Sequence, residues 1–214
     1  MAGRTSKKPT TKGKPHSRSD THAATSVLER LKAHESAVVL KILLERHQTL
    51  REEAEQIATE LVSSPSVDEV AENVLAALTL IGIDSVNARA GRTSWGYVDP
   101  TEAAWELLEE ALEDVISNMK RRMELDLVDA AVVMCRGIVV GLRRAGEFES
   151  DGALGWAPDF PAEEACNVVE ELLRAFPVTN REDTVGRLVD ALAGDVPDWS
   201  EMLEQVAKRA MSGK

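Results

Sequence analysis

Aromatic side chains are scarce in this chain of 214 residues, where they make up 4% of the sequence although hydrophobic residues make up 43%. The apolar content therefore consists mainly of Ala, Leu and Val. Such a composition favours helices packed on helices over a β-sandwich, whose core relies on aromatic and β-branched pairs. The few aromatic residues are also unevenly placed, because all of them follow residue 94. A chain of this length can bury a sizeable core as one domain.

Cysteines are nearly as rare, and long hydrophobic runs are missing. Cys135 and Cys166 both lie in apolar stretches with helical spacing, and two such residues cannot form the disulfide framework of a small secreted domain. The first residues are polar and basic, unlike a secretory signal. The longest apolar stretch, residues 127–142, contains Asp129 and Arg136 and is too short to span a bilayer. We therefore expect a cytoplasmic protein without a membrane partner.

Motifs for metals, cofactors and catalysis are absent too. The four His residues form no Glu-x-x-His or His-Glu-x-x-His pattern, and no Cys-x-x-Cys occurs. Residues 91–98, GRTSWGYV, hold two glycines at P-loop spacing, but Tyr97 and Val98 stand where a P-loop has Lys and a hydroxyl residue. Ser94 has no His in the second half of the chain to activate it. We expect no cofactor, no metal and no enzymatic activity.

Charge of one sign dominates most of the chain. The formal net charge is −12, but residues 1–24 carry six basic side chains and one acidic side chain, a charge of +5. Residues 25–214 therefore carry −17, and a surface that acidic repels nucleic acid and attracts basic partners. Residues 1–23 have almost no apolar side chains, which predicts a disordered basic arm. Residues 24–214 are predicted to form a single all-α domain.

The arm has two interpretations. Its basic side chains could contact the phosphates of a nucleic acid without reading bases, and the candidates are Arg4, Lys7, Lys8, Lys12, Lys14 and Arg18. No aromatic residue is present there to stack on bases. The competing interpretation is a tail that adds solubility or folds back on the acidic body.

From residue 24 onward, apolar residues recur at helical spacing, and no strand pattern is found. The expected helices span residues 24–46, 49–63, 66–81, 100–123, 126–145, 161–176, 181–193 and 197–211. Several begin with a predicted N-cap, among them Ser66, Asp99 and Asp198. The fold class that follows is all-α, with seven or eight helices arranged as a compact bundle or as stacked αα-hairpins.

The stretch 126–145 is apolar on nearly every side, which predicts the central and most buried helix. Gly137 and Gly141 are four residues apart, a spacing that lets a neighbouring helix approach closely. Arg136 is the one charged residue inside this run and needs a carboxylate partner or an exit to solvent.

The two longest connections, residues 84–99 and 146–160, collect aromatic and arginine residues. Trp and Arg are favoured in binding hot spots, so these residues are candidates for a partner-binding surface: Arg89, Arg92, Trp95, Tyr97, Trp156 and Phe160. The alternative is that the aromatic residues anchor the connections onto the bundle and support helix starts. Whether the two connections form one surface is left open.

These observations favour a non-enzymatic protein–protein interaction or adaptor module that acts through an acidic helical body. Its partner would be another protein, of basic character where it meets the acidic surface. The alternative is a nucleic-acid-associated factor whose basic arm contacts phosphates. The sequence fixes neither the oligomeric state nor the identity of the partner.

Overall fold

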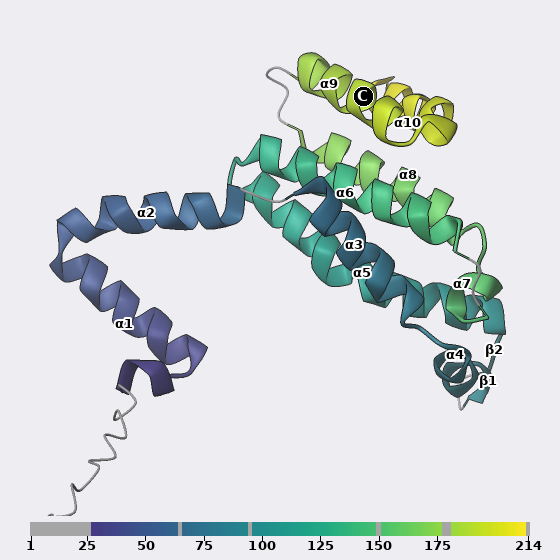
Figure 1. Cartoon of the computed structure of the whole chain (residues 1–214), viewed down its shortest axis with the longest axis horizontal. Coiled ribbons are helices and arrows are strands. Elements are labelled where there is room, and N and C mark those ends of the chain that lie inside the picture. Colours follow the sequence, from purple (N-terminus) through teal and green to yellow (C-terminus); the bar gives the residue numbers. More distant parts are fainter. Residues whose placement is uncertain (1–26, 64–65, 94–95, 149–150, 177–180, 213–214) are drawn as a thin grey trace, which may run out of the picture. The chain divides into compact units, whose positions relative to one another are not determined.

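The computed structural model of the chain is shown in Figure 1, and it describes residues 27–63, 66–93, 96–148, 151–176 and 181–212. The described residues are predominantly helical, which confirms the all-α class. The chain divides into two units, Met1–Glu53 and Ala54–Lys214. The predicted arm, residues 1–23, lies outside the described residues, and the single domain predicted for residues 24–214 stays a prediction.

The first unit contains a short 3₁₀ helix, η1 (Val27–Arg30), then α1 (Ala33–Arg46) and the start of α2 (Gln48–Ser63). The helix expected over 24–46 is therefore interrupted before Ala33. Glu35 fixes the start of α1, because its carboxylate accepts a hydrogen bond from the backbone N–H of Lys32 at 2.8 Å. Among the described residues of this unit none is buried.

Six helices of the second unit match the expected ranges within three residues at each end. They are α3 (Val67–Thr79), α5 (Pro100–Glu124), α6 (Val128–Gly146), α8 (Phe160–Ala175), α9 (Arg181–Asp195) and α10 (Ser200–Ser212). Helix α6 packs against α3, α5, α8 and α9, and α10 packs against α8 and α9. The prediction that the 126–145 stretch is central is confirmed, since ten residues of α6 are buried.

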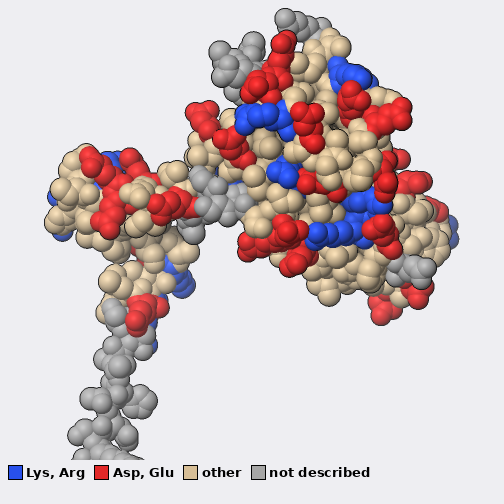
Figure 2. Space-filling model, turned by 45° about the horizontal axis from the view of Figure 1, so that its top comes forward, with Lys and Arg blue, Asp and Glu red and all other residues tan. Residues whose placement is uncertain are grey.

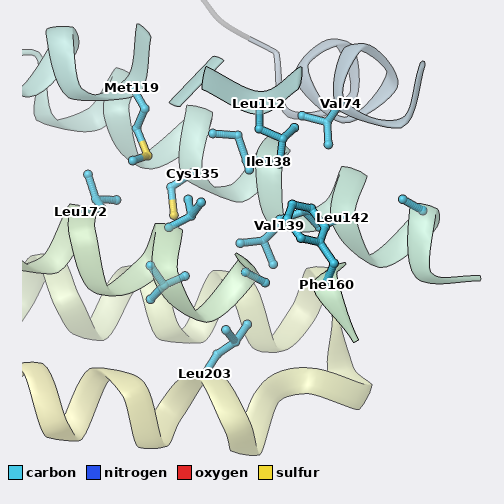
Figure 3. Close-up of a cluster of buried hydrophobic side chains, with 14 of the residues drawn as sticks. Val74, Leu112, Met119, Cys135, Ile138, Val139, Leu142, Phe160, Leu172 and Leu203 are labelled. Atoms are coloured by element: carbon cyan, nitrogen blue, oxygen red, sulfur yellow. The ribbon is translucent and has the colours of Figure 1, made fainter. Parts of the chain in front are cut away.

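The core of the second unit lies around α6 (Figure 3). It is built mainly from aliphatic side chains, with the rings of Phe160 and Phe176 among them. The aliphatic members include Leu108, Leu112, Ile138, Leu142 and Leu172. Cys135 lies inside it, and burial raises the pKa of its thiol to about 12. This thiol therefore remains protonated and behaves as a small core residue.

The two glycines of α6 bring α3 into close contact, as their spacing predicts. A Cβ atom added at Gly137 would lie 2.5 Å from Cβ of Val70, and one added at Gly141 would lie 2.6 Å from Cβ of Val74. Real Cβ atoms do not approach one another so closely. The glycines therefore serve internal packing in this chain, and their face of α6 is covered by α3.

Arg136 finds the carboxylate that its position requires. Its Nε donates to Asp195 Oδ2 at 2.7 Å and its Nη2 donates to Oδ1 at 3.1 Å. This two-pronged ion pair ties α6 to the end of α9 and raises the pKa of the arginine, chiefly through the hydrogen bond.

Short elements are the main difference from the prediction. The described residues contain ten α-helices, because α4 (Ile83–Arg89) and α7 (Ala153–Trp156) lie in the two connections that were expected to be irregular. A 3₁₀ helix, η2 (Pro197–Trp199), precedes α10. Asp198 therefore lies within η2 and does not cap α10; its carboxylate instead accepts a hydrogen bond from Arg143.

The expectation that the chain has no strand is wrong. Strands β1 (Gly91–Thr93) and β2 (Gly96–Val98) pair antiparallel, with Arg92 opposite Tyr97. Gly91 and Gly96 have φ angles of 103° and 145°, in the region that favours glycine. The two glycines of GRTSWGYV therefore shape a hairpin, which leads directly into α5. Asp99 begins that helix as predicted, because its side chain accepts a hydrogen bond from the N–H of Thr101 at 2.8 Å.

Candidate functional site

The two long connections meet at one end of the second unit. Helix α7 contacts both α4 and α5, and the N–H of Ala153 donates to the carbonyl of Ile81 at 3.0 Å. Figure 1 shows α4, the β1–β2 hairpin and α7 together at this end. The question left open by the sequence is thereby answered, because the connections lie next to each other in space. We call the surface formed by α4, the β1–β2 hairpin and α7 the end surface.

Several of the predicted partner-binding residues are exposed on the end surface. Tyr97 is 69% exposed and Trp156 is 44% exposed, and Arg92 is exposed as well. Trp95 lies outside the described residues. Sequence reasoning missed Leu80, which is 83% exposed at the break between α3 and α4. Nothing in the periodicity of α3 distinguishes this leucine from the buried ones that precede it.

Phe160 does not belong to an exposed surface, so its assignment to the partner-binding set has no support from its position. The ring is fully buried and meets Trp105 edge to face, with the ring centroids 4.9 Å apart and an interplanar angle of 75°. It is the first residue of α8, where it joins α8 to α5. For Phe160 the alternative interpretation, an aromatic anchor at a helix start, is the one that fits.

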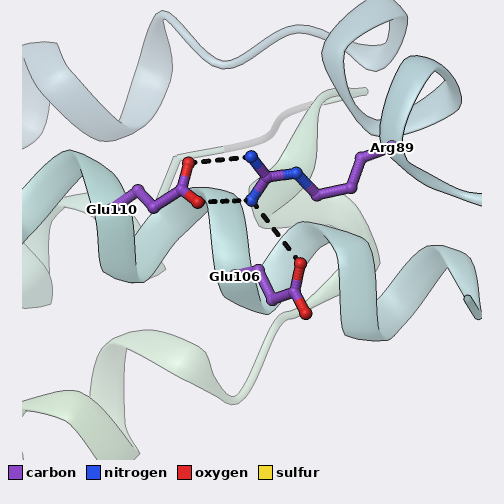
Figure 4. Close-up of polar contacts among 3 residues, drawn as sticks. All are labelled: Arg89, Glu106 and Glu110. Atoms are coloured by element: carbon purple, nitrogen blue, oxygen red, sulfur yellow. Dashed lines mark hydrogen bonds and ion pairs between the residues drawn. The ribbon is translucent and has the colours of Figure 1, made fainter.

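Arg89 is engaged inside the chain (Figure 4). Its two terminal nitrogens donate to the carboxylate oxygens of Glu110 at 2.8 and 2.9 Å, and Nη1 lies 3.5 Å from Glu106. The hydrogen bond to Glu110 raises the pKa of Arg89 and lowers that of Glu110. The guanidinium thus fastens α4 to α5, so we do not count Arg89 among the groups available to a partner.

A groove between α5 and α8 concentrates the acidic character of the second unit. Its volume is about 470 Å³, and six glutamates and one lysine contribute to its lining: Glu106, Glu109, Glu110, Glu113, Glu164, Glu171 and Lys120. Ile116 and Ser117 complete it. The space-filling view in Figure 2 shows Asp and Glu side chains interspersed with fewer Lys and Arg over one face of this unit. We call the groove lined by these six glutamates and Lys120 the acidic groove.

Glu164 lies in the acidic groove with only 8% of its surface exposed. Its Oε2 accepts a hydrogen bond from Asn167 at 3.0 Å. Burial raises the pKa of this carboxyl, and the nearby carboxylates of Glu109 and Glu171 raise it further, against the opposing effects of Asn167 and Lys120. A cation that reached Glu164 would relieve this unfavourable burial of negative charge.

Lys120 only partly offsets the acidic lining, because its Nζ pairs with Glu171 at 2.6 Å. The same two residues also line a neighbouring hollow of about 390 Å³, whose floor is apolar. The apolar residues there are Met119, Met123, Leu172 and Ala175. The acidic groove therefore continues along α5 and α8 into a hydrophobic section.

Sequence reasoning did not assign the glutamates of residues 100–123 to any site and so missed this groove. The repeated Glu residues of α5 were visible, but their proximity to Glu164 and Glu171 depends on how α5 packs beside α8. No spacing within either helix encodes that contact. Among the residues that the structure describes, no group of three or more His, Cys, Asp or Glu is placed to hold a metal ion.

Within the described ranges, no helix combines the length and apolar composition needed to cross a membrane. The fold and the groove together define an all-α bundle with an acidic, partly apolar surface groove. Comparisons with protein families, with curated proteins and with solved structures give no match for this chain.

Proposed function

We propose that this chain is a non-enzymatic interaction module whose acidic groove binds a basic, amphipathic segment of another protein. The observation that carries the proposal is the lining of the groove, which holds six glutamates. Glu106 and Glu110 are paired with Arg89 and Glu171 is paired with Lys120, so Glu109, Glu113 and Glu164 remain to meet the cations of a ligand. The adjoining apolar section, where Met123 and Ala175 reach the surface, supports a ligand that has an apolar face as well. We propose a cytoplasmic location for it, supported by the two free cysteines, Cys135 and Cys166.

A helix with Lys or Arg residues at spacings of three and four positions suits this lining. Such a ligand would place its cations beside Glu109 and Glu113 of α5 and its apolar side chains over Met123 and Ala175. Charge-assisted hydrogen bonds to carboxylates are stronger than neutral ones, especially where the carboxylate is withdrawn from water, as Glu164 is.

The test is a titration of the full chain with a basic amphipathic helical peptide, in which isothermal calorimetry measures the binding constant. The double variant Glu109→Gln and Glu113→Gln should weaken binding by roughly tenfold to a hundredfold, since each of the two lost charge contacts is worth about 0.7–1.4 kcal/mol. The matched control is Glu69→Gln with Glu72→Gln, which removes the same charge from the exposed face of α3.

Equal weakening by both double variants would mean that the peptide responds to net charge and not to the groove. Absence of binding by the unaltered chain would also contradict the proposal. The binding constant should fall as salt is raised, because the contacts are between charges at a largely exposed surface.

The end surface is a second candidate for contact with a protein, supported by the exposure of Tyr97 and Trp156. The alternative function, a nucleic-acid-associated factor, depends on arm residues that lie outside the described residues. It stays a prediction, and deleting residues 1–23 tests it. Nucleic-acid binding that survives this deletion with its salt dependence unchanged would eliminate the arm as its source.

A further inference from the structure

Helix α1 is apolar over most of its circumference, yet none of its residues is buried. Eight of its fourteen residues are Ala, Val, Leu or Ile. Val38 is 56% exposed and Leu40 is 52% exposed, and Ile42 and Leu43 are exposed as well. These side chains point in several directions around the helix axis, because successive residues are rotated by about 100°. A helix of this kind normally lies in the interior of a multi-helix assembly.

The spacing of these residues suits packing against other helices. Ala33, Ala37, Leu40 and Leu44 follow the alternation of four and three positions that is typical of helices in coiled coils and bundles. Three of them line a shallow groove of about 370 Å³ in the first unit, together with Lys41, Glu45 and Arg51. The groove is thus apolar along its length and has charges of both signs beside it.

The charge of this segment differs from that of the remaining chain. Residues 27–53 carry five acidic and five basic side chains, a balance of zero, whereas residues 54–214 carry −17. A neutral apolar helix offers no net charge with which to select a strongly acidic or basic partner. It also offers no net repulsion to an identical helix, and the cations and the carboxylate beside the groove can pair across a two-fold axis.

We propose that two copies of this chain associate through α1, whose apolar surface and the groove beside Leu40 become buried in the contact. The other helix face with a dimer-like glycine spacing, on α6, is already covered by α3 and is not available. This inference does not rest on the proposed function of the acidic groove.

The test is sedimentation equilibrium of the full chain over a range of concentrations and salt. A dimer is expected, and its association constant should rise from about 50 to about 500 mM salt, because screening reduces repulsion between two acidic chains. Basic-peptide binding at the acidic groove has the opposite salt dependence, so the two proposals can fail independently.

Two substitutions locate the interface. Leu40→Glu should lower the association constant by about a hundredfold or more, since a buried charge without a partner is costly. Leu80→Glu makes the same change at an 83% exposed position of the second unit and should leave association unchanged. Because Leu40 is exposed in the single chain, the fold should survive, and the milder Leu43→Gln provides a second check.

A chain that remains monomeric at every concentration overturns the proposal. A dimer that is indifferent to both α1 substitutions overturns it as well, as does one that is weakened equally by Leu80→Glu. Capture of a different protein by α1, without self-association, would assign the surface to another partner and would also count against it.

Discussion

At the scale of single residues, arginine side chains join helices of this chain by binding carboxylates on neighbouring elements. Arg136 and Arg89 each hold a carboxylate with two hydrogen bonds, and each thereby joins two helices. Arg143 adds a third link, since it pairs with Glu147 and Asp198 and lies 5.9 Å from the ring centre of Trp199. The need of Arg136 for a partner was predictable from its apolar surroundings. The identity of that partner was not, because Asp195 is 59 residues away.

Glu164 gives a prediction at this scale. Its raised pKa means that the folded chain holds this proton more tightly than the unfolded chain does. Its contribution to the free energy of unfolding therefore falls as pH rises through the ordinary glutamate value of about 4.3 toward the raised value. Glu164→Gln removes this effect. The variant should be more stable than the unaltered chain at neutral pH, and this advantage should vanish below about pH 4.

Urea unfolding, monitored by circular dichroism at several pH values, measures the difference in the free energy of unfolding between Glu164→Gln and the unaltered chain. The control is Glu163→Gln, one position earlier in α8, where the side chain is exposed to solvent. A stability difference for Glu164→Gln that does not change with pH would show that the raised pKa has no part in it.

At the scale of helices and strands, an element could be predicted from the sequence only when it was long. The long amphipathic segment that became α5 and the apolar run that became α6 each give more than three turns of consistent pattern. Helices α4 and α7 have seven and four residues, and each strand has three, which is too short for any periodicity to appear. Their positions follow from glycines and from contacts with α5.

Helix α1 shows a different limit. The helical spacing of its apolar residues predicted a helix, and α1 does form as one, yet none of its residues is buried. Burial of a side chain requires a second surface that packs against it, and the sequence of α1 does not specify that surface. The acidic groove was missed for the same reason, since Glu164 meets the glutamates of α5 only through the packing of α5 beside α8.

The contact between α3 and α6 gives a prediction at the scale of elements. Gly137→Ala should destabilise the fold by about 1–3 kcal/mol, because the new methyl group overfills the contact with Val70. This is the net loss that remains after the gain of about 1 kcal/mol in helix propensity is subtracted. The matched control is Gly186→Ala in α9, where no atom lies within 4 Å of the added Cβ, and it should stabilise the fold by about 0.5–1 kcal/mol.

Urea unfolding of both variants decides the matter. Equal behaviour of the two glycine substitutions, in either direction, would mean that α3 and α6 are not in the close contact described.

For the molecule as a whole, the unequal distribution of charge is the dominant electrostatic feature. Residues 54–214 carry −17, and most of the ion pairs in this unit are at least partly exposed. Exposed pairs contribute about 0–1 kcal/mol each, so salt removes little stability by screening them. Screening the net repulsion should matter more.

We therefore predict that the free energy of unfolding rises when salt is increased from about 50 to about 300 mM. Sodium chloride is suitable because it screens charge without the strong exclusion effects of sulfate. Comparison with an uncharged osmolyte at equal osmolality separates screening from other effects. A fall in stability with salt would mean that the ion pairs outweigh the repulsion.

The edge-to-face pair of Trp105 and Phe160 has a consequence for spectroscopy. A tryptophan held against a second ring in a fixed geometry gives near-ultraviolet circular dichroism that reports the packing of α5 on α8. All four tryptophans follow residue 94, so intrinsic fluorescence originates only from the second unit. The first unit contains no tryptophan. A tryptophan placed in α1 would therefore add an emission signal that reports the environment of α1.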